Sequence, residues 1–115
     1  MGKIDLSYLE NITGGDNEVM TEMIDLMLSE TPKHIEKIKQ AHEKENWKEL
    51  GAESHKLKPM FLYVGLTSLN EIAQDLEKFG KEAISLKSIP GLIDELEQGY
   101  LEIVDELKSK KDELS

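Results

Sequence analysis

The sequence predicts an all-α fold, an antiparallel four-helix bundle with a short extra helix at the N-terminus. Apolar residues recur three and four positions apart along most of the chain, which is the helical period. The β-branched runs typical of strands are missing, and proline is confined to Pro32, Pro59 and Pro90. Four substantial amphipathic segments with short connections are typical of a bundle. We therefore expect one domain over residues 1–115.

A glycine turn separates the first two predicted helices. The short helix is expected around residues 4–12, and it should end at Gly14 and Gly15. Asp16 follows and is a suitable N-cap for the next helix. The turn therefore marks where the bundle proper begins.

The second helix is expected from residue 17 to about residue 44, with a bend at Pro32. Its main apolar stripe consists of Met20, Ile24, Met27, Leu28, Thr31, Ile35 and Ile38. A second stripe points away from the first one and consists of Val19, Met23 and Leu26. We expect the short N-terminal helix to cover this second stripe through Leu6, Leu9 and Ile12 and to leave an apolar rim beside His55.

The third helix is expected to begin after Asn46, which serves as N-cap, and to run to about Tyr63, with Gly65 closing it. Glu49 lies three residues after the cap, as in a capping box. Its core seam has spacings of four, three, four and three and consists of Leu50, Ser54, Leu57, Phe61 and Val64.

The last two helices have equally clear apolar faces. The fourth is expected to start at Thr67 or Ser68 and to end at Gly80, with an inward face of Leu69, Ile72, Ala73, Leu76 and Phe79. The fifth is expected to start near Ser88 and Pro90. Its inward face consists of Ile89, Leu92, Ile93, Leu96, Tyr100, Ile103, Val104 and Leu107.

His55 lies on the third helix at roughly 130° from the centre of the core seam, so we expect its imidazole on the solvent side. Gly51 and Pro59 lie one turn to either side of it and cost about 1 and 3 kcal/mol in a helix interior. Locally unfavourable residues gathered in one place often mark a functional site. An exposed neutral imidazole is a nucleophile near neutral pH, and Lys58, one turn along, could stabilise phosphoryl oxygens.

The stretch "SHKLKPMFLYVG" resembles the motif of histidine-phosphotransfer (HPt) domains in two-component phosphorelays. His55, Leu57, Lys58 and Gly65 match that motif at its spacings, and the likeness extends to "IDLSYLENITGGD", "LSETP" and "LEKFGK". The resemblance implies that His55 is the phosphoacceptor. In this interpretation the protein accepts a phosphoryl group from a receiver-domain aspartate and passes it to another receiver, with Lys58 stabilising the phosphoryl group.

The resemblance also implies the partners and cofactors. These are receiver domains of response regulators, or a hybrid sensor kinase, and the magnesium ion belongs to the receiver, so the chain has no cofactor of its own. No phosphate-binding glycine loop is present, and autonomous ATP-dependent kinase activity is not expected. Pro59 departs from the family motif, which has glycine there. We expect Gly51, Pro59 and Leu62 to form a docking face for the receiver.

Composition and charge limit the kinds of partner, the cellular location and the metal sites that we expect for this chain. The formal net charge of −10 disfavours nucleic acid and anionic membrane surfaces as partners. No apolar run approaches a membrane span, and the chain contains no cysteine, so we expect a soluble, cytoplasmic protein. We also expect it to be a monomer. His34 and His42 lack the neighbours of a bundle metal site, and no metal ligand is predicted.

Two alternatives remain open. A degenerate HPt-like helical adaptor would bind a partner without phosphotransfer, and His55 is the residue that separates it from a carrier. A metal-binding bundle is disfavoured because the predicted core seams are apolar. The cognate receivers, the direction of phosphoryl flow and the signal relayed do not follow from the sequence. Neither does the question of whether the domain stands alone or belongs to a hybrid kinase.

Overall fold

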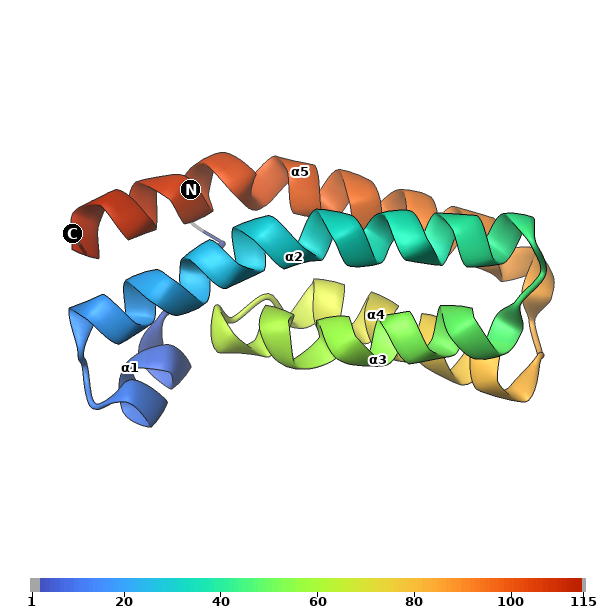
Figure 1. Ribbon diagram of the computed structural model, residues 1–115, viewed down its shortest axis with the longest axis horizontal. Coiled ribbons are helices and arrows are strands. Elements are labelled where there is room, and N and C mark those ends of the chain that lie inside the picture. Colours follow the sequence, from blue (N-terminus) through green and yellow to red (C-terminus); the bar gives the residue numbers. More distant parts are fainter. Residues whose placement is uncertain (1–2, 115) are drawn as a thin grey trace.

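A computed structural model describes residues 3–114, and within that range the chain forms helices and no strands, as predicted. The elements are α1 (Ser7–Thr13), α2 (Asn17–Glu43), α3 (Trp47–Tyr63), α4 (Thr67–Glu82), the 3₁₀ turn η1 (Leu86–Ser88) and α5 (Ile89–Leu114). Helices α2 to α5 run antiparallel along an elongated bundle of 42 × 24 × 20 Å. The short helix α1 lies across one end of the bundle (Figure 1). The predicted four-helix bundle with an extra N-terminal helix is confirmed.

Local side-chain chemistry sets the start of α2 and of α3. The Asp16 carboxylate accepts hydrogen bonds from the backbone N–H groups of Glu18 and Val19, and the Asn46 side chain accepts one from the N–H of Glu49 at 3.2 Å. Both residues satisfy donors that would otherwise be unpaired at a helix start. Both predicted caps are therefore confirmed.

Both ends of α4 differ from the prediction. Its N-cap is Leu66, which makes no side-chain cap hydrogen bond, and both hydroxyl residues expected as caps lie inside the first turn. The helix also continues through Gly80 to Glu82 and ends where Ala83 adopts a left-handed conformation with φ of 52°. Gly80 lies inside the helix, where the absence of a side chain allows the close approach of α4 to α3 described below.

The core follows the predicted stripes closely. All five residues of the predicted α3 seam are at most 1% exposed, and the main stripe of α2 is buried except for Leu28, which is half-buried. Helices α2 and α3 continue through Pro32 and Pro59 without a break. The sequence pattern therefore identified which face of each helix packs inward.

The predicted cover over the second stripe of α2 is incomplete. Helix α1 packs into the bundle through Leu9, which is fully buried, but Ile12 remains 49% exposed. On α2, Val19 and Leu26 are 38% and 56% exposed. Helix α1 has only two turns, so it buries one side chain and leaves an apolar rim at this end.

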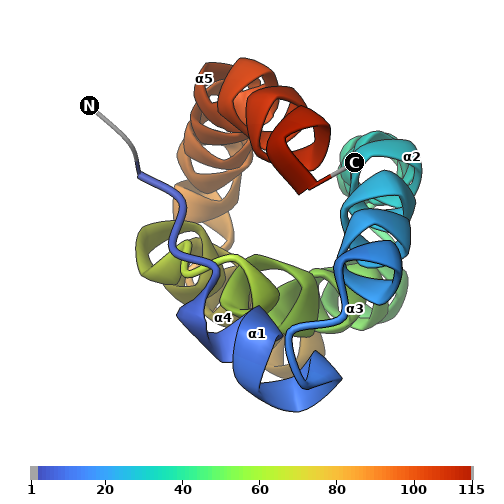
Figure 2. The ribbon, with the colours of Figure 1, turned by 90° about the vertical axis from the view of Figure 1, so that its left-hand side faces the viewer.

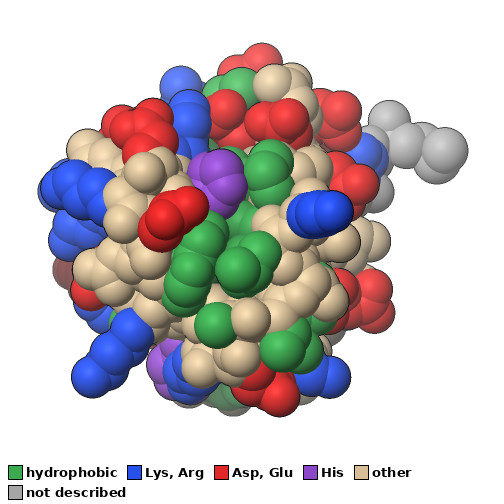
Figure 3. All heavy atoms as spheres, turned by 90° about the vertical axis from the view of Figure 1, so that its right-hand side faces the viewer, with side chains coloured by type: hydrophobic (Ala, Val, Ile, Leu, Met, Phe, Trp, Pro, Cys, Tyr) green, Lys and Arg blue, Asp and Glu red, His purple; other side chains and the backbone are tan. Residues whose placement is uncertain are grey.

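The opposite end of the bundle has its own surface character (Figure 3). The α2–α3 and α4–α5 connections lie there, and hydrophobic side chains gather at the centre of this face with charged groups around them. The rings of His42 and Trp47 are in contact at this end, with centroids 5.9 Å apart. Ile84 is 40% exposed nearby in the α4–α5 connection. His42 therefore packs against an aromatic ring.

Candidate functional site

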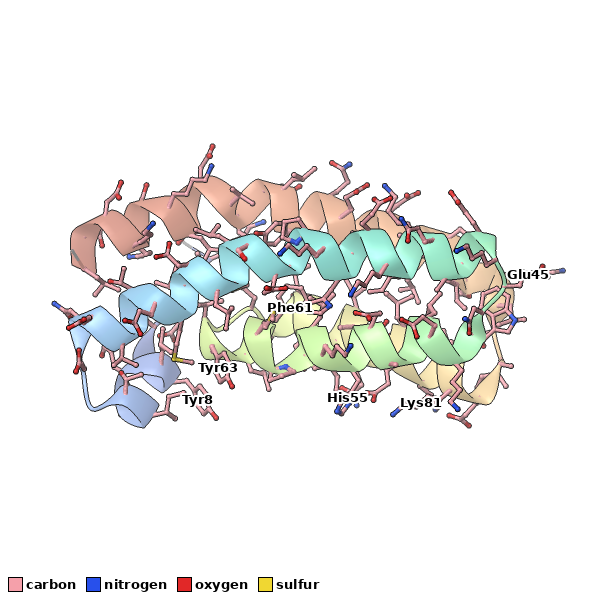
Figure 4. All side chains as sticks on the ribbon, in the orientation of Figure 1. Tyr8, Glu45, His55, Phe61, Tyr63 and Lys81 are labelled. Atoms are coloured by element: carbon pink, nitrogen blue, oxygen red, sulfur yellow. The ribbon has the colours of Figure 1, made fainter. Side chains whose placement is uncertain are left out.

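His55 lies in the middle of α3 and its side chain is 62% exposed, which confirms the predicted solvent-side position. The imidazole projects from the outer edge of the bundle, whereas Phe61 on the same helix points into the core (Figure 4). The ring is therefore open to a large partner.

A carboxylate that the sequence did not indicate, that of Glu77, forms a hydrogen bond with His55. Glu77 on α4 accepts a hydrogen bond from the Nδ1 atom of His55 at 2.6 Å through its Oε2 atom. The Nζ atoms of Lys58 and Lys81 lie 2.5 and 2.8 Å from the Glu77 carboxylate oxygens. One carboxylate, 11% exposed, thus binds an imidazole and two ammonium groups. We call His55, Lys58, Glu77 and Lys81 the α3–α4 cluster.

The charge of Glu77 decides which nitrogen of His55 carries the proton. Burial alone would raise the pKa of Glu77, but hydrogen bonds from Lys58, Lys81 and His55 outweigh it and lower the pKa to about 2. An ionised carboxylate only accepts hydrogen bonds, so the Nδ1 atom of His55 must be the donor. In the neutral ring the Nε2 atom then carries a free lone pair.

The α3–α4 cluster depends on an unusually close helix crossing. A Cβ atom added to Gly80 would lie 2.7 Å from the Trp47 carbonyl oxygen and 2.8 Å from the Gly51 nitrogen. A Cβ atom on Gly51 would lie 3.0 Å from Cγ of Lys81, so the stem of Lys81 lies directly over this glycine. The paired glycines let the two helix backbones approach, and that approach brings Glu77 and Lys81 within reach of His55.

Gly51 is accordingly buried between α3 and α4. The sequence placed it on an exposed docking face, and that placement is wrong: Gly51 contacts α4. Its unfavourable helix propensity is explained by packing, because any side chain at this position would push against the α4 backbone.

The other predicted site residues are exposed or partly exposed. The Lys58 side chain is 26% exposed and its Nζ atom faces Glu77, while Pro59 and Leu62 are exposed on the next turn. The amide of Asn70 donates a hydrogen bond to the Lys58 carbonyl at 3.0 Å, which ties α4 to α3 beside the proline. Lys58, Pro59 and Leu62 thus lie within two turns of His55 on the accessible side of α3.

An apolar surface lies on the α1 side of His55. Tyr8 of α1 stacks on Tyr63 of α3, with ring centroids 6.2 Å apart and an interplanar angle of 17°. These two rings lie on the same edge of the bundle as His55 and Lys81 (Figure 4). The exposed apolar side chains at this end of the bundle are Tyr8, Ile12, Val19, Leu26 and Leu62. We call these five residues the apolar rim.

His34 was predicted to be solvated or structural without an acidic neighbour, and the structure provides one from another helix. Its Nδ1 atom lies 2.6 Å from Glu53 Oε2, and both side chains are largely buried. Burial raises the pKa of Glu53, but hydrogen bonds from His34 and Lys56 and the nearby charges outweigh it, so the net shift is downward. This pair links α2 to α3 across the helix interface, in agreement with a structural role.

The pH dependence of stability tests the α3–α4 cluster directly. Because the folded-state pKa of Glu77 is about 2 and its ordinary value is 4.5, its contribution is present above about pH 4.5 and is lost as the pH falls toward 2. We expect the free energy of unfolding of Glu77→Gln to be about 1 to 3 kcal/mol lower than that of the wild type at pH 7. Urea denaturation followed by circular dichroism should show that difference shrink in acid.

The matched control is Glu71→Gln, an exposed position on the same helix. Its stability should stay within about 0.5 kcal/mol of the wild type at every pH. A Glu77→Gln deficit that does not change between pH 7 and pH 2.5 would contradict the assigned charge state.

The site thus consists of an exposed imidazole on a helical bundle, a carboxylate that fixes its tautomer and two neighbouring lysines. The family model of the Hpt domain matches residues 22–109, and the chain therefore belongs to the Hpt domain family. Membership implies phosphotransfer through a histidine in two-component signalling, with partners such as receiver domains.

A solved structure supports the fold. The HPT domain of the Hpt sensor hybrid histidine kinase from Shewanella superposes with a TM-score of 0.81 and 19% sequence identity, over 98% of this chain and 97% of that chain. The comparison with curated proteins gave no match. Within residues 3–114, no helix is long and apolar enough to cross a membrane.

Proposed function

We propose that this protein is a phosphorelay carrier in which His55 accepts a phosphoryl group from the aspartate of one receiver domain and passes it to another. The observation that carries the proposal is the 2.6 Å contact between His55 Nδ1 and the ionised Glu77. It presents the Nε2 lone pair on an exposed ring.

The transfer follows from that tautomer. The Nε2 lone pair attacks the phosphorus of the aspartyl phosphate, the N–P bond forms, and the P–O bond to the aspartate breaks, so the carboxylate leaves with its electron pair. The Nδ1 proton stays on the ring, which thereby gains positive charge. Glu77 accepts the hydrogen bond of that proton and stabilises the charge. Transfer to the second receiver is the same sequence in reverse.

Lys58 and Lys81 supply positive charge next to the carboxylate that binds His55. Both ammonium groups form ion pairs with Glu77. With an ionised carboxylate and a neutral imidazole, the α3–α4 cluster has a net charge of about +1. This cationic site lies on a chain with a formal net charge of −10. It therefore attracts phosphoryl oxygens locally on a surface that otherwise repels anions.

The receiver contributes the remaining chemistry. A magnesium ion bound by the receiver would neutralise charge on the phosphoryl group, and the chain needs no cofactor of its own for the steps above. We place the receiver against Pro59 and the apolar rim, to which Leu62 belongs, because these residues offer exposed apolar contact area on the α1 side of His55. Backbone amide shifts measured on adding an unphosphorylated receiver should cluster on this surface.

Incubation with and without a phosphorylated receiver tests the proposal. We expect one added phosphoryl group by intact mass when a phosphorylated receiver and magnesium are present, as an acid-labile and base-stable adduct. ATP alone should give none. Robust labelling by ATP without any kinase would overturn the carrier function. Tight receiver binding without transfer would instead favour the adaptor.

Lys58→Ala should slow transfer or shorten the lifetime of the phosphorylated state and leave His55 as the acceptor. The loss of one charge-assisted contact is worth about 1 to 3 kcal/mol, or roughly 5- to 150-fold in rate. Rapid-quench transfer from a phosphorylated receiver measures the effect.

Lys48→Ala removes an exposed lysine from the same helix and serves as the control. We expect it to transfer within about twofold of the wild type. Equal rates and equal phosphohistidine lifetimes for the two variants would make Lys58 an ordinary surface residue.

A further inference from the structure

A groove of about 600 Å³ lies between the start of α4 and the middle of α5. Its floor is apolar, because Leu66, Leu69 and Ile103 are buried there and Ile72 is half-buried. None of its lining residues belongs to the α3–α4 cluster or to the apolar rim. The groove is thus separate from the proposed acceptor and from its docking surface.

Gly99 of α5 lines this groove and is half-buried. A Cβ atom on Gly99 would lie 2.5 Å from a methyl carbon of Leu69, so the leucine lies flat against the helix backbone. A side chain at position 99 would displace Leu69. The shape of the groove therefore depends on the contact between Gly99 and Leu69.

The α5 wall of the groove is acidic. Glu95, Gln98 and Glu102 are exposed along it, and the two glutamates are seven residues apart, which is about 10 Å along a helix. Glu95 forms no ion pair with any residue in the described range 3–114. The apolar floor and the acidic wall of the groove together favour a ligand that is apolar on one side and cationic on the other.

The chain's own N-terminal segment shows how a basic residue binds here. The Nζ atom of Lys3 lies 3.2 Å from Glu102. The backbone N–H groups of Lys3 and Ile4 donate to the two carboxylate oxygens of Glu106 at 2.9 and 3.1 Å. Figure 2 shows this segment passing from α5 toward α4 and α1. It occupies one end of the acidic wall and leaves Glu95 free.

We propose that this groove binds a basic amphipathic segment of a protein partner. A lysine or arginine of that segment would pair with Glu95, and its apolar side chains would contact Leu66, Leu69 and Ile72. Nucleic acid and anionic lipid do not fit, because both would meet the acidic wall on a strongly negative molecule. Binding here would leave His55 accessible, so one carrier could hold a partner and exchange phosphoryl groups at once.

The probe is a synthetic amphipathic helix of leucine and lysine, about 14 residues or four turns long, added at about 0.15 M salt, where long-range attraction is screened. A peptide with each lysine replaced by glutamate is its counterpart. We expect the lysine peptide to bind with a micromolar dissociation constant and to shift the backbone amides of Ser68, Ile72, Gln98 and Gly99 most. Amide shifts spread evenly over the acidic surface, or equal binding of the glutamate peptide, would overturn the proposal.

Charge reversal at two positions on α5 separates a specific groove from general attraction. Glu95→Lys should weaken binding of the lysine peptide at least tenfold, an effect of about 1.4 kcal/mol or more. Asp105→Lys makes the same change at an exposed position outside the groove and should weaken it less than about threefold. Equal losses in the two variants would refute the groove. Phosphoryl labelling of His55 should be unchanged in both, so this test is independent of the proposed function.

Discussion

His55→Ala should abolish phosphoryl labelling by a phosphorylated receiver and leave the helical fold nearly intact. The ring is 62% exposed, so its loss removes little packing, whereas no other described histidine combines exposure with a carboxylate and two lysines. Intact mass after incubation, together with the circular dichroism spectrum and thermal unfolding, checks both parts. Stability should change by less than about 1 kcal/mol.

The other two histidines are internal controls for that result. His42→Ala should label like the wild type, because His42 contacts Trp47 at the far end of the bundle. His34→Ala should also label. This variant must be tested at a temperature where it remains folded, because the loss of His34 deprives the buried Glu53 of a hydrogen-bond partner. Full phosphorylation of the His55 variant would place the acceptor elsewhere.

Gly80→Ala should produce the largest loss of stability among single-methyl changes in the helices. The added Cβ atom would lie under 3.0 Å from backbone atoms of Trp47 and Gly51, and backbone cannot move aside as a side chain does. We expect about 1 to 3 kcal/mol of destabilisation, seen as a fall of several degrees in the midpoint of thermal unfolding. Because α4 must shift away from α3, the rate of phosphoryl transfer should fall as well.

Gly91→Ala gives the opposite expectation and so makes a matched control. Gly91 lies in α5, and a Cβ atom there would meet nothing within 4 Å. Alanine should stabilise the helix by about 0.5 kcal/mol through its better helix propensity. Equal stability of the Gly80 and Gly91 variants would show that the α3–α4 crossing tolerates a wider separation.

The fold was predictable because it depends on periodicity, which is local. Apolar spacing identified the buried faces of α2 to α5, and Asp16 and Asn46 identified two helix starts. The same reasoning failed at Gly80, where a residue that usually ends helices is used for a helix crossing. Spacing within one helix carries no information about how closely a second helix approaches.

The candidate site was predictable only in part for the same reason. His55 and Lys58 share a helix, so their relation follows from one sequence segment, whereas Glu77 and Lys81 reach them from α4. The available signal was weak: a glutamate beside the core residue Leu76, with a lysine four residues later. Glu53 and His34 pair across helices in the same way, and spacing along α2 could not show it.

The division of the α3–α4 cluster between two helices has a consequence for how the protein responds to heat. His55, the proposed nucleophile, lies on α3, and Glu77, which fixes its tautomer, lies on α4. A chain that has lost its tertiary structure therefore keeps the histidine but loses its contact with the carboxylate. A peptide with the sequence of α3 alone should therefore be a poor acceptor. In the intact protein, the rate of phosphoryl acceptance should fall along the thermal unfolding curve in proportion to the folded fraction.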